Sequence, residues 1–203
     1  IIYNLSPFNN ETNMSSAEYI IKKLSAFILI YVFSAVLGEG IIIGILYGMG
    51  YDPLHGIMPD GQISELLLYY GFLIFSLATL LYCRFIEKKN MKLIGFAGNP
   101  TEYLAGTLIA AILLFIIIGI GCISGSIEFG GFNTNVNIKS LLLWVLAFGI
   151  QGAAEEIMCR GFLLHSLKNR ISVPLAILIS STAFVFPHLS SLLEAELVYA
   201  MVG

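Results

Sequence analysis

Residues 141–164 read LLLWVLAFGIQGAAEEIMCRGFLL, an apolar run that three ionisable side chains interrupt near its end. The run is long enough to cross the hydrocarbon core of a bilayer, which takes about 20 residues of helix. Its charged residues are Glu155, Glu156 and Arg160. Insertion scales put each such group at roughly 2.5–3.5 kcal/mol at the centre of a membrane helix, so these groups are retained where they are paired or functional. The run therefore predicts a membrane-spanning helix whose polar cluster either braces the fold or carries chemistry.

The composition of the whole chain also indicates a membrane protein. Its 203 residues are 58% hydrophobic and 11% charged, whereas soluble domains are about 25% charged. The lipid bilayer is the solvent that suits such a chain, and the net charge of −3 gives no reason to expect nucleic acid as a partner. Cys83, Cys122 and Cys159 lie in or beside apolar stretches without metal-ligand spacing, so we interpret them as small hydrophobic residues.

Five stretches have the length and polarity of a membrane span. They are residues 24–47, 66–83, 104–123, 141–164 and 173–193. Residues 197–203 look like the beginning of another. The sequence thus predicts an all-α fold, a polytopic transmembrane helical bundle of five spans plus the start of a sixth.

Basic residues are divided unevenly between the connections. The connections before the first span and after the second and fourth hold Lys22, Lys23, Arg84, Lys88, Lys89, Lys92, Lys168 and Arg170. The opposite connections, residues 50–65 and 124–140, hold only Lys139. Because cytoplasmic loops are enriched in Lys and Arg, we predict a multi-pass integral membrane protein with its N-terminus in the cytoplasm. Residues 1–19 are the predicted cytoplasmic segment, and residues 20–203 form one membrane domain.

Helix geometry divides the charged cluster of the fourth span. Glu156 and Arg160 are four positions apart, so they share a face and can pair. Glu155 lies about 100° further round the helix, and we expect it to have no partner on its own helix. A carboxylate in that setting suits a general base. An ion-pair network that braces the bundle explains the same residues equally well.

The fifth predicted span brings a second polar group to the same depth. It contains His188, which follows Pro187. At 1.5 Å per residue, Glu155 lies ~15 Å and His188 ~22 Å from the cytoplasmic end of its span. The short connection between the two spans predicts that they are neighbours. The carboxylate and the imidazole are therefore expected to meet, where together they could bind and activate one water molecule.

These residues resemble the two motifs of an intramembrane protease family, the CAAX protease and bacteriocin-processing family, also called CPBP or Abi. A Glu-Glu pair followed by three residues and Arg is matched by Glu155, Glu156 and Arg160. Phe followed by three residues and His is matched by Phe184 and His188. The motif region covers residues 141–193 of the predicted membrane domain.

The resemblance implies an intramembrane endopeptidase that acts on a membrane-associated peptide or protein, as in CAAX-type prenyl protein or leader-peptide processing. Glu155 would be the general base that activates water with His188, and Glu156 and Arg160 would orient the site. The family is described both as metalloproteases and as metal-free glutamate endopeptidases. A stable zinc site needs three protein ligands, for which the sequence offers Glu155 and His188, with Glu156 a third candidate. We expect no cofactor, and a divalent metal such as zinc is the alternative.

The resemblance also implies a third motif, a His with Asn or Asp four positions later. Residues 189–203 contain neither His nor Asn, so we expect the sequence to be truncated at its C-terminus. A second hypothesis is a non-catalytic membrane immunity or scaffold protein with a structural Glu-Arg pair. A transporter is disfavoured because the polar residues lie on two consecutive helices and no repeat is visible. No pattern predicts an oligomeric state.

The first span carries two further features. Glu39 lies either near the outer end of the span, where water reaches it, or in the site. Gly40, Gly44 and Gly48, which we call the glycine stripe, have the spacing of a helix-packing surface. We expect this stripe to pack inside the protein.

Overall fold

The computed structural model describes residues 14–59, 61–88, 94, 99–128, 130–131, 136–185 and 188. Among these residues the chain is helical, and the one β-bridge joins Asp52 to Ile57. In chain order the elements are α2 (Ser16–Gly48), the 3-10 helix η1 (Pro53–His55), α3 (Gly61–Leu81), the π-helix η2 (Tyr82–Ile86), α4 (Pro100–Ile123), α5 (Ile138–Glu156), the π-helix η4 (Ile157–Leu164), α6 (His165–Leu167) and α7 (Val173–Val185).

In the part of the chain that the structure describes, four helices are long and apolar enough to cross a membrane. They are Ser16–Gly48, Gly61–Ile86, Pro100–Ile123 and Ile138–Leu167. These helices contain the first four predicted spans and confirm the class of polytopic helical membrane protein. Of the fifth predicted span, α7 and His188 are described; Pro187 and the predicted start of a sixth span lie outside the described residues.

Side-chain caps set where three of these helices begin. The hydroxyl of Ser15 accepts a hydrogen bond from the backbone N–H of Glu18, and the carboxylate of Glu18 accepts one from the N–H of Ser15. This reciprocal capping box begins α2 at Ser16, well before residue 24, where the sequence predicted the span. The side chains of Asn99 and Asn137 likewise accept hydrogen bonds from backbone N–H groups in the first turns of α4 and α5. The first helix therefore begins within residues 1–19, the predicted cytoplasmic segment.

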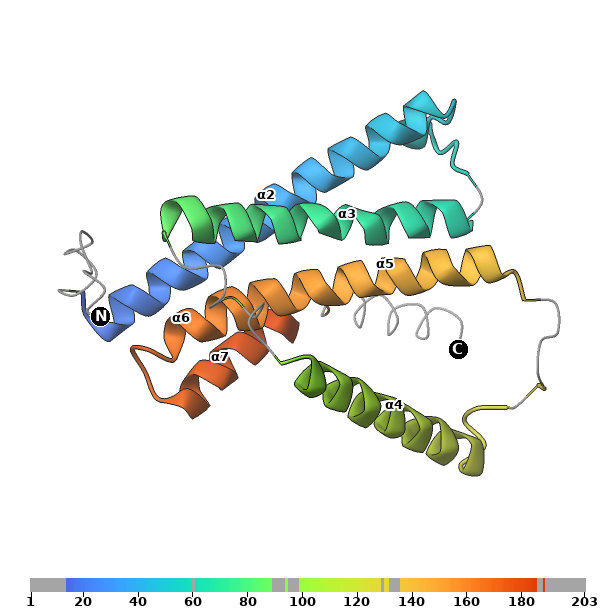
Figure 1. Ribbon diagram of the computed structural model, residues 1–203. Helices are drawn as coiled ribbons and strands as arrows, with labels where there is room; N and C mark the ends of the chain where they lie inside the picture. Colours follow the sequence, from blue (N-terminus) through green and yellow to red (C-terminus); the bar gives the residue numbers. More distant parts are fainter. Residues whose placement is uncertain are drawn as a thin grey trace, which may run out of the picture.

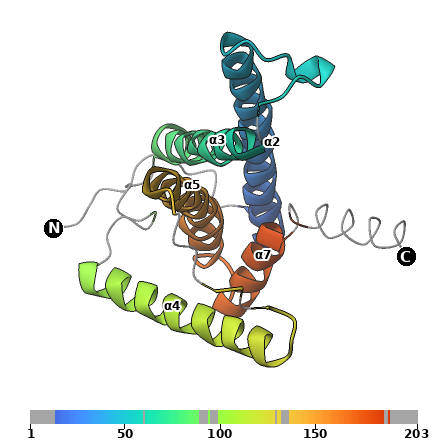
Figure 2. The same ribbon diagram turned by 90° about the vertical axis from the view of Figure 1, so that its right-hand side faces the viewer.

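The helices pack as a bundle from which α4 stands apart. Helix α2 crosses α3, α3 runs beside α5, and α7 folds back against η4 (Figures 1 and 2). Tyr69 of α3 packs against the rings of Trp144 and Phe148 on α5, at centroid distances of 5.7 and 4.9 Å. No residue of α4 is buried. Lipid can solvate α4 on every side because it is apolar all round.

Two glycines lie where α2 crosses α3, but they are not the glycines that we predicted. A Cβ atom on Gly38 would lie 3.7 Å from the backbone oxygen of Gly71, and one on Gly71 would lie 3.0 Å from Cδ1 of Ile42. Among the described residues, a Cβ on any member of the glycine stripe would have no heavy atom within 4 Å. The prediction that the stripe packs inside the protein is wrong. The regular spacing was visible in the sequence, but the face of α2 that meets α3 was not.

The core lies where α2, α3, η4 and α7 converge. Its most buried apolar members are Cys83, Ile94, Ala154, Phe162, Leu163, Leu167 and Ala176. Beside it, Lys23 and Glu87 form an ion pair of 2.6 Å with side chains only 1% and 5% exposed. This pair joins the start of α2 to the residue after η2. The site described next is built on this packed end of the bundle.

Candidate active site

The helix that carries the charged cluster changes its winding directly after Glu156. Helix α5 passes into the π-helix η4, in place of the regular α-helix that the sequence predicted. A π-helix uses i→i+5 hydrogen bonds and often marks a functional site. The buried hydroxyl of Ser180 on α7 donates to the backbone oxygen of Cys159 in η4, at 2.8 Å. This bond fixes the position of α7 relative to η4. It therefore determines which residues of α7 face Glu155.

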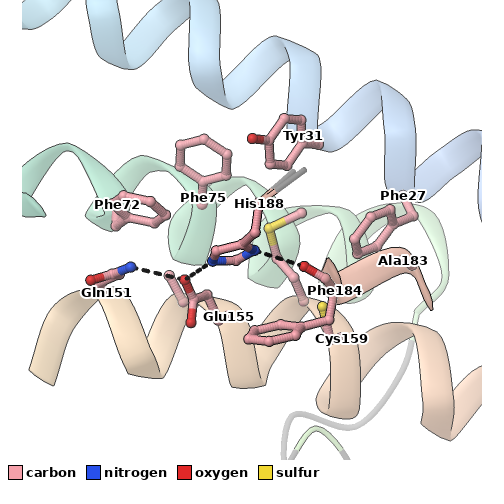
Figure 3. Close-up of a pocket in the computed structure, with 12 residues that line it drawn as sticks. Phe27, Tyr31, Phe72, Phe75, Gln151, Glu155, Cys159, Ala183, Phe184 and His188 are labelled. Carbon is pink, nitrogen blue, oxygen red and sulfur yellow. Dashed lines mark hydrogen bonds and ion pairs between the residues drawn. The ribbon is translucent and has the colours of Figure 1, made fainter. Parts of the chain in front are cut away.

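Glu155 and His188 face each other, as the depth argument predicted. Nε2 of His188 lies 3.9 Å from Oε1 of Glu155 (Figure 3). This distance is longer than a direct hydrogen bond. A polar contact of this length is compatible with a water molecule between the two groups.

The ring of His188 is held by the residue that begins its motif. Nδ1 lies 3.0 Å from the backbone oxygen of Phe184, and the two rings are 5.1 Å apart. A carbonyl oxygen only accepts hydrogen bonds, so Nδ1 carries the hydrogen. In the neutral imidazole Nε2 is then an acceptor, and it is directed at the carboxylate.

Glu155 has a partner on its own helix, which corrects our prediction. The amide Nε2 of Gln151 donates to Oε1 of Glu155 at 3.0 Å. Gln151 lies four residues before Glu155, the spacing that puts two side chains on one helix face. The signal was present in the sequence, because Gln151 is an uncharged polar residue within an otherwise apolar run.

The predicted pair of Glu156 and Arg160 is present. The guanidinium Nη1 lies 2.9 Å from Oε1 of Glu156, and the side chains of Arg160 and Glu156 are 43% and 62% exposed. The guanidinium also lies 4.9 Å from the ring centroid of Phe184, a cation–π arrangement. Arg160 therefore connects the pair to α7.

A cavity of about 140 Å³ contains the facing groups. Its walls come from four parts of the bundle. They are Phe27 and Tyr31 from α2, Phe72 and Phe75 from α3, Gln151, Ala154, Glu155, Met158 and Cys159 from α5 and η4, and Ala183, Phe184 and His188 from the end of the described chain (Figure 3). A cavity of this volume has room for several water molecules. Tyr31 was not predicted, and nothing in the local sequence of α2 connects it with the motifs.

Two other ionisable residues lie away from the cavity. Glu39 is exposed on α2 and is not among the cavity's lining residues. His55, the last residue of η1, is exposed and pairs with Asp52 at 2.8 Å. Asp52 also accepts a hydrogen bond from Tyr47 at 2.8 Å. These bonds, chiefly that from Tyr47, hold the pKa of Asp52 below its ordinary value.

The donor set of the cavity is incomplete for zinc among the described residues. In that part of the chain, no three His, Cys, Asp or Glu side chains lie close enough to hold one metal ion. Glu155 and His188 supply two protein donors, and a stable zinc site needs three.

The fold and the cavity define a polytopic helical membrane protein with an internal carboxylate–imidazole pair. A family model described as Type II CAAX prenyl endopeptidase Rce1-like matches residues 137–203. The matched segment contains every candidate residue of the two motifs, and the match confirms the resemblance that they indicated. At the family level it indicates a CAAX-type membrane protease. No curated protein and no solved structure shows significant similarity to the chain.

Proposed function

We propose that this protein is an intramembrane endopeptidase that hydrolyses a peptide bond with a water molecule activated by Glu155 and His188. The observation that carries the proposal is the 3.9 Å separation of Oε1 and Nε2 inside the cavity. The matched family segment supports the reaction class. The substrate is a membrane-associated peptide or protein, such as a CAAX-type prenyl protein or a leader peptide.

The two groups suit one water molecule because both accept hydrogen bonds. If one water oxygen lies about 2.8 Å from both Oε1 and Nε2, the 3.9 Å between those two atoms sets an angle of roughly 90° at the water oxygen. That is close to the angle between the two hydrogens of water. A water that donates to both Oε1 and Nε2 has its lone pairs directed away from them. The substrate carbonyl carbon is attacked from that open side.

Each step then moves one proton. The water oxygen forms a bond to the carbonyl carbon, the carbonyl electrons move to its oxygen, and Glu155 takes a proton as general base. The C–N bond breaks as the tetrahedral intermediate collapses, and the proton on Glu155 passes to the leaving nitrogen. The products are a carboxylic acid and an amine. No step requires a metal, and Glu156 and Arg160 act by holding Phe184 and His188 in place.

The activity test uses a reporter peptide in proteoliposomes, offered with and without a prenyl group on a C-terminal CAAX sequence. Glu155→Gln and His188→Ala should each abolish hydrolysis while leaving the helical circular dichroism unchanged. Thr182→Val, on the exposed face of α7, is the control and should cleave at the wild-type rate. Hydrolysis retained in either site variant rejects the proposal. A folded wild type that cleaves neither peptide favours the immunity or scaffold hypothesis.

We also propose that the N-terminus is cytoplasmic. The start of α2, the end of η2 and the turn after α6 lie at one end of the bundle (Figure 1). That end carries Lys22, Arg84, Lys88, Lys168 and Arg170. In a chain whose native cysteines are replaced by alanine, an impermeant thiol reagent on intact cells should label Leu54→Cys and not Asn169→Cys. The reverse labelling would overturn this orientation.

A further inference from the structure

Gln151 is a polar residue of the candidate site that belongs to neither motif. It is half-buried on α5 and lines the cavity one helical turn before Glu155. Its amide Nε2 donates to Oε1 of Glu155 at 3.0 Å (Figure 3). The role of this amide therefore depends on what the carboxylate does.

The same carboxylate oxygen makes both contacts. Oε1 of Glu155 lies 3.0 Å from the Gln151 amide and 3.9 Å from Nε2 of His188. A glutamate side chain has several rotamers, and rotation about its last torsion exchanges the two oxygens. A fixed donor removes that freedom. The amide group can offer only its NH₂ to the carboxylate, because its own oxygen and the carboxylate are both acceptors.

We propose that Gln151 is a positioning residue that keeps Oε1 of Glu155 directed at His188. This inference rests on the proposed function. The amide orients the base before substrate binds, so that one water can reach both Oε1 and Nε2. The amide does not touch the water or the substrate, and it acts through Glu155 alone.

The cavity offers few other groups that could take over this role. Tyr31 faces it from α2, Cys159 from η4, and His188 from beyond α7, whereas α3 contributes the rings of Phe72 and Phe75. The other amide-bearing and carboxyl side chains of the described chain do not line it. Loss of the Gln151 amide is therefore expected to release the carboxylate.

The test compares two substitutions at this position in the full chain in proteoliposomes. Gln151→Met keeps the length of the side chain and removes the donor. It should lower kcat by about 10²-fold, the scale of an ångström of misplacement at a reacting centre, with KM within about twofold. Gln151→Glu can donate only when its new carboxyl is protonated, so its activity should reappear on the acid side of the wild-type pH profile. The control Thr182→Val should change neither constant.

A spectroscopic measurement separates this inference from the proposed function. The carboxylate stretch of Glu155 is assigned in the infrared spectrum by its loss in Glu155→Gln, and it should shift in Gln151→Met because a hydrogen bond is removed. A kcat of Gln151→Met within twofold of an active wild type, or an unshifted band, overturns the inference. If the wild type itself cleaves nothing while the band shifts, the contact stands and the proposed function fails.

Discussion

Helix α4 and the continuous helix formed by α5, η4 and α6 are both long enough to cross a membrane. They differ in how much they pack against the rest of the protein and in the charges they carry. Helix α4 buries none of its residues and is apolar from Leu104 onward. The α5–η4–α6 helix contains charged residues and changes from α- to π-helical winding. Most of its buried residues lie in η4. Apolar length alone therefore predicts a span. Interruptions of the apolar pattern predict where the protein packs and where chemistry is located.

The largest effect on stability should come from breaking the buried ion pair at the packed end of the bundle. Lys23→Met leaves the carboxylate of Glu87 buried beside Tyr82. Removing one partner of a buried pair costs about 3–5 kcal/mol. The free energy of unfolding in mixed micelles should fall by that amount, and Lys22→Met, at an exposed position on the same turn, should change it little.

A double variant shows whether an unpaired charge is the cause. Lys23→Met with Glu87→Leu removes both charges and should recover most of the lost stability. If the double variant is less stable than Lys23→Met alone, packing of the side chains and not the ion pair holds this end together.

A smaller loss of stability is expected when a glycine of the packed helix is replaced by alanine than when the ion pair is broken. The matched substitution in α4 is the control. A Cβ on Gly161 would lie 2.5 Å from the backbone oxygen of Ile94, whereas one on Gly119 of α4 would meet no atom of the described residues within 4 Å. Gly161→Ala should lower the free energy of unfolding by about 1–3 kcal/mol, as overpacking does. Gly119→Ala should be neutral or slightly stabilising, since alanine is the better helix former. Equal effects at both positions would mean that η4 is no more tightly packed than α4.

A comparable or smaller effect is expected where α7 is tied to η4. Ser180→Ala removes the donor to the buried oxygen of Cys159, and an unsatisfied buried acceptor costs about 1–3 kcal/mol. Thr182→Ala removes a bond within α7 on an exposed face and should stay within about 0.5 kcal/mol. Thermal unfolding followed by circular dichroism separates the two. A Ser180→Ala protein as stable as Thr182→Ala would remove this bond from the account of how His188 is placed.

Removal of metal should have no effect on hydrolysis. The proposed reaction uses Glu155 and His188 alone, so incubation with a strong chelator should leave kcat and KM unchanged. Loss of activity that zinc restores would show that a third donor completes a metal site.

Much of the fold followed from apolar length, and much of the site followed from motif spacing. The pairing of Glu156 with Arg160 and the meeting of Glu155 with His188 were both predicted, because helix periodicity and depth are properties of short stretches. Two signals were present and overlooked: the capping box at Ser15 and the amide of Gln151. Both follow local rules of helix geometry.

The remaining features depend on contacts between segments that are distant in the sequence. The π-helix η4 has no pattern of its own, and the hydroxyl that satisfies its backbone comes from α7. The face of α2 that meets α3 carries Gly38, which lies opposite Gly71 of α3. Tyr31 enters the cavity only because α2 crosses the bundle there. The sequence of a single helix cannot predict such contacts.

A double-mutant cycle on Glu155 and His188 tests the central claim most directly. Single-turnover hydrolysis is measured for the wild type, Glu155→Gln, His188→Ala and the double variant. If the two side chains activate one water molecule together, removing either one removes the whole effect, and all three variants should share the same residual rate. A double variant slower than both by the product of the single losses, or a single variant with wild-type turnover, would contradict the account.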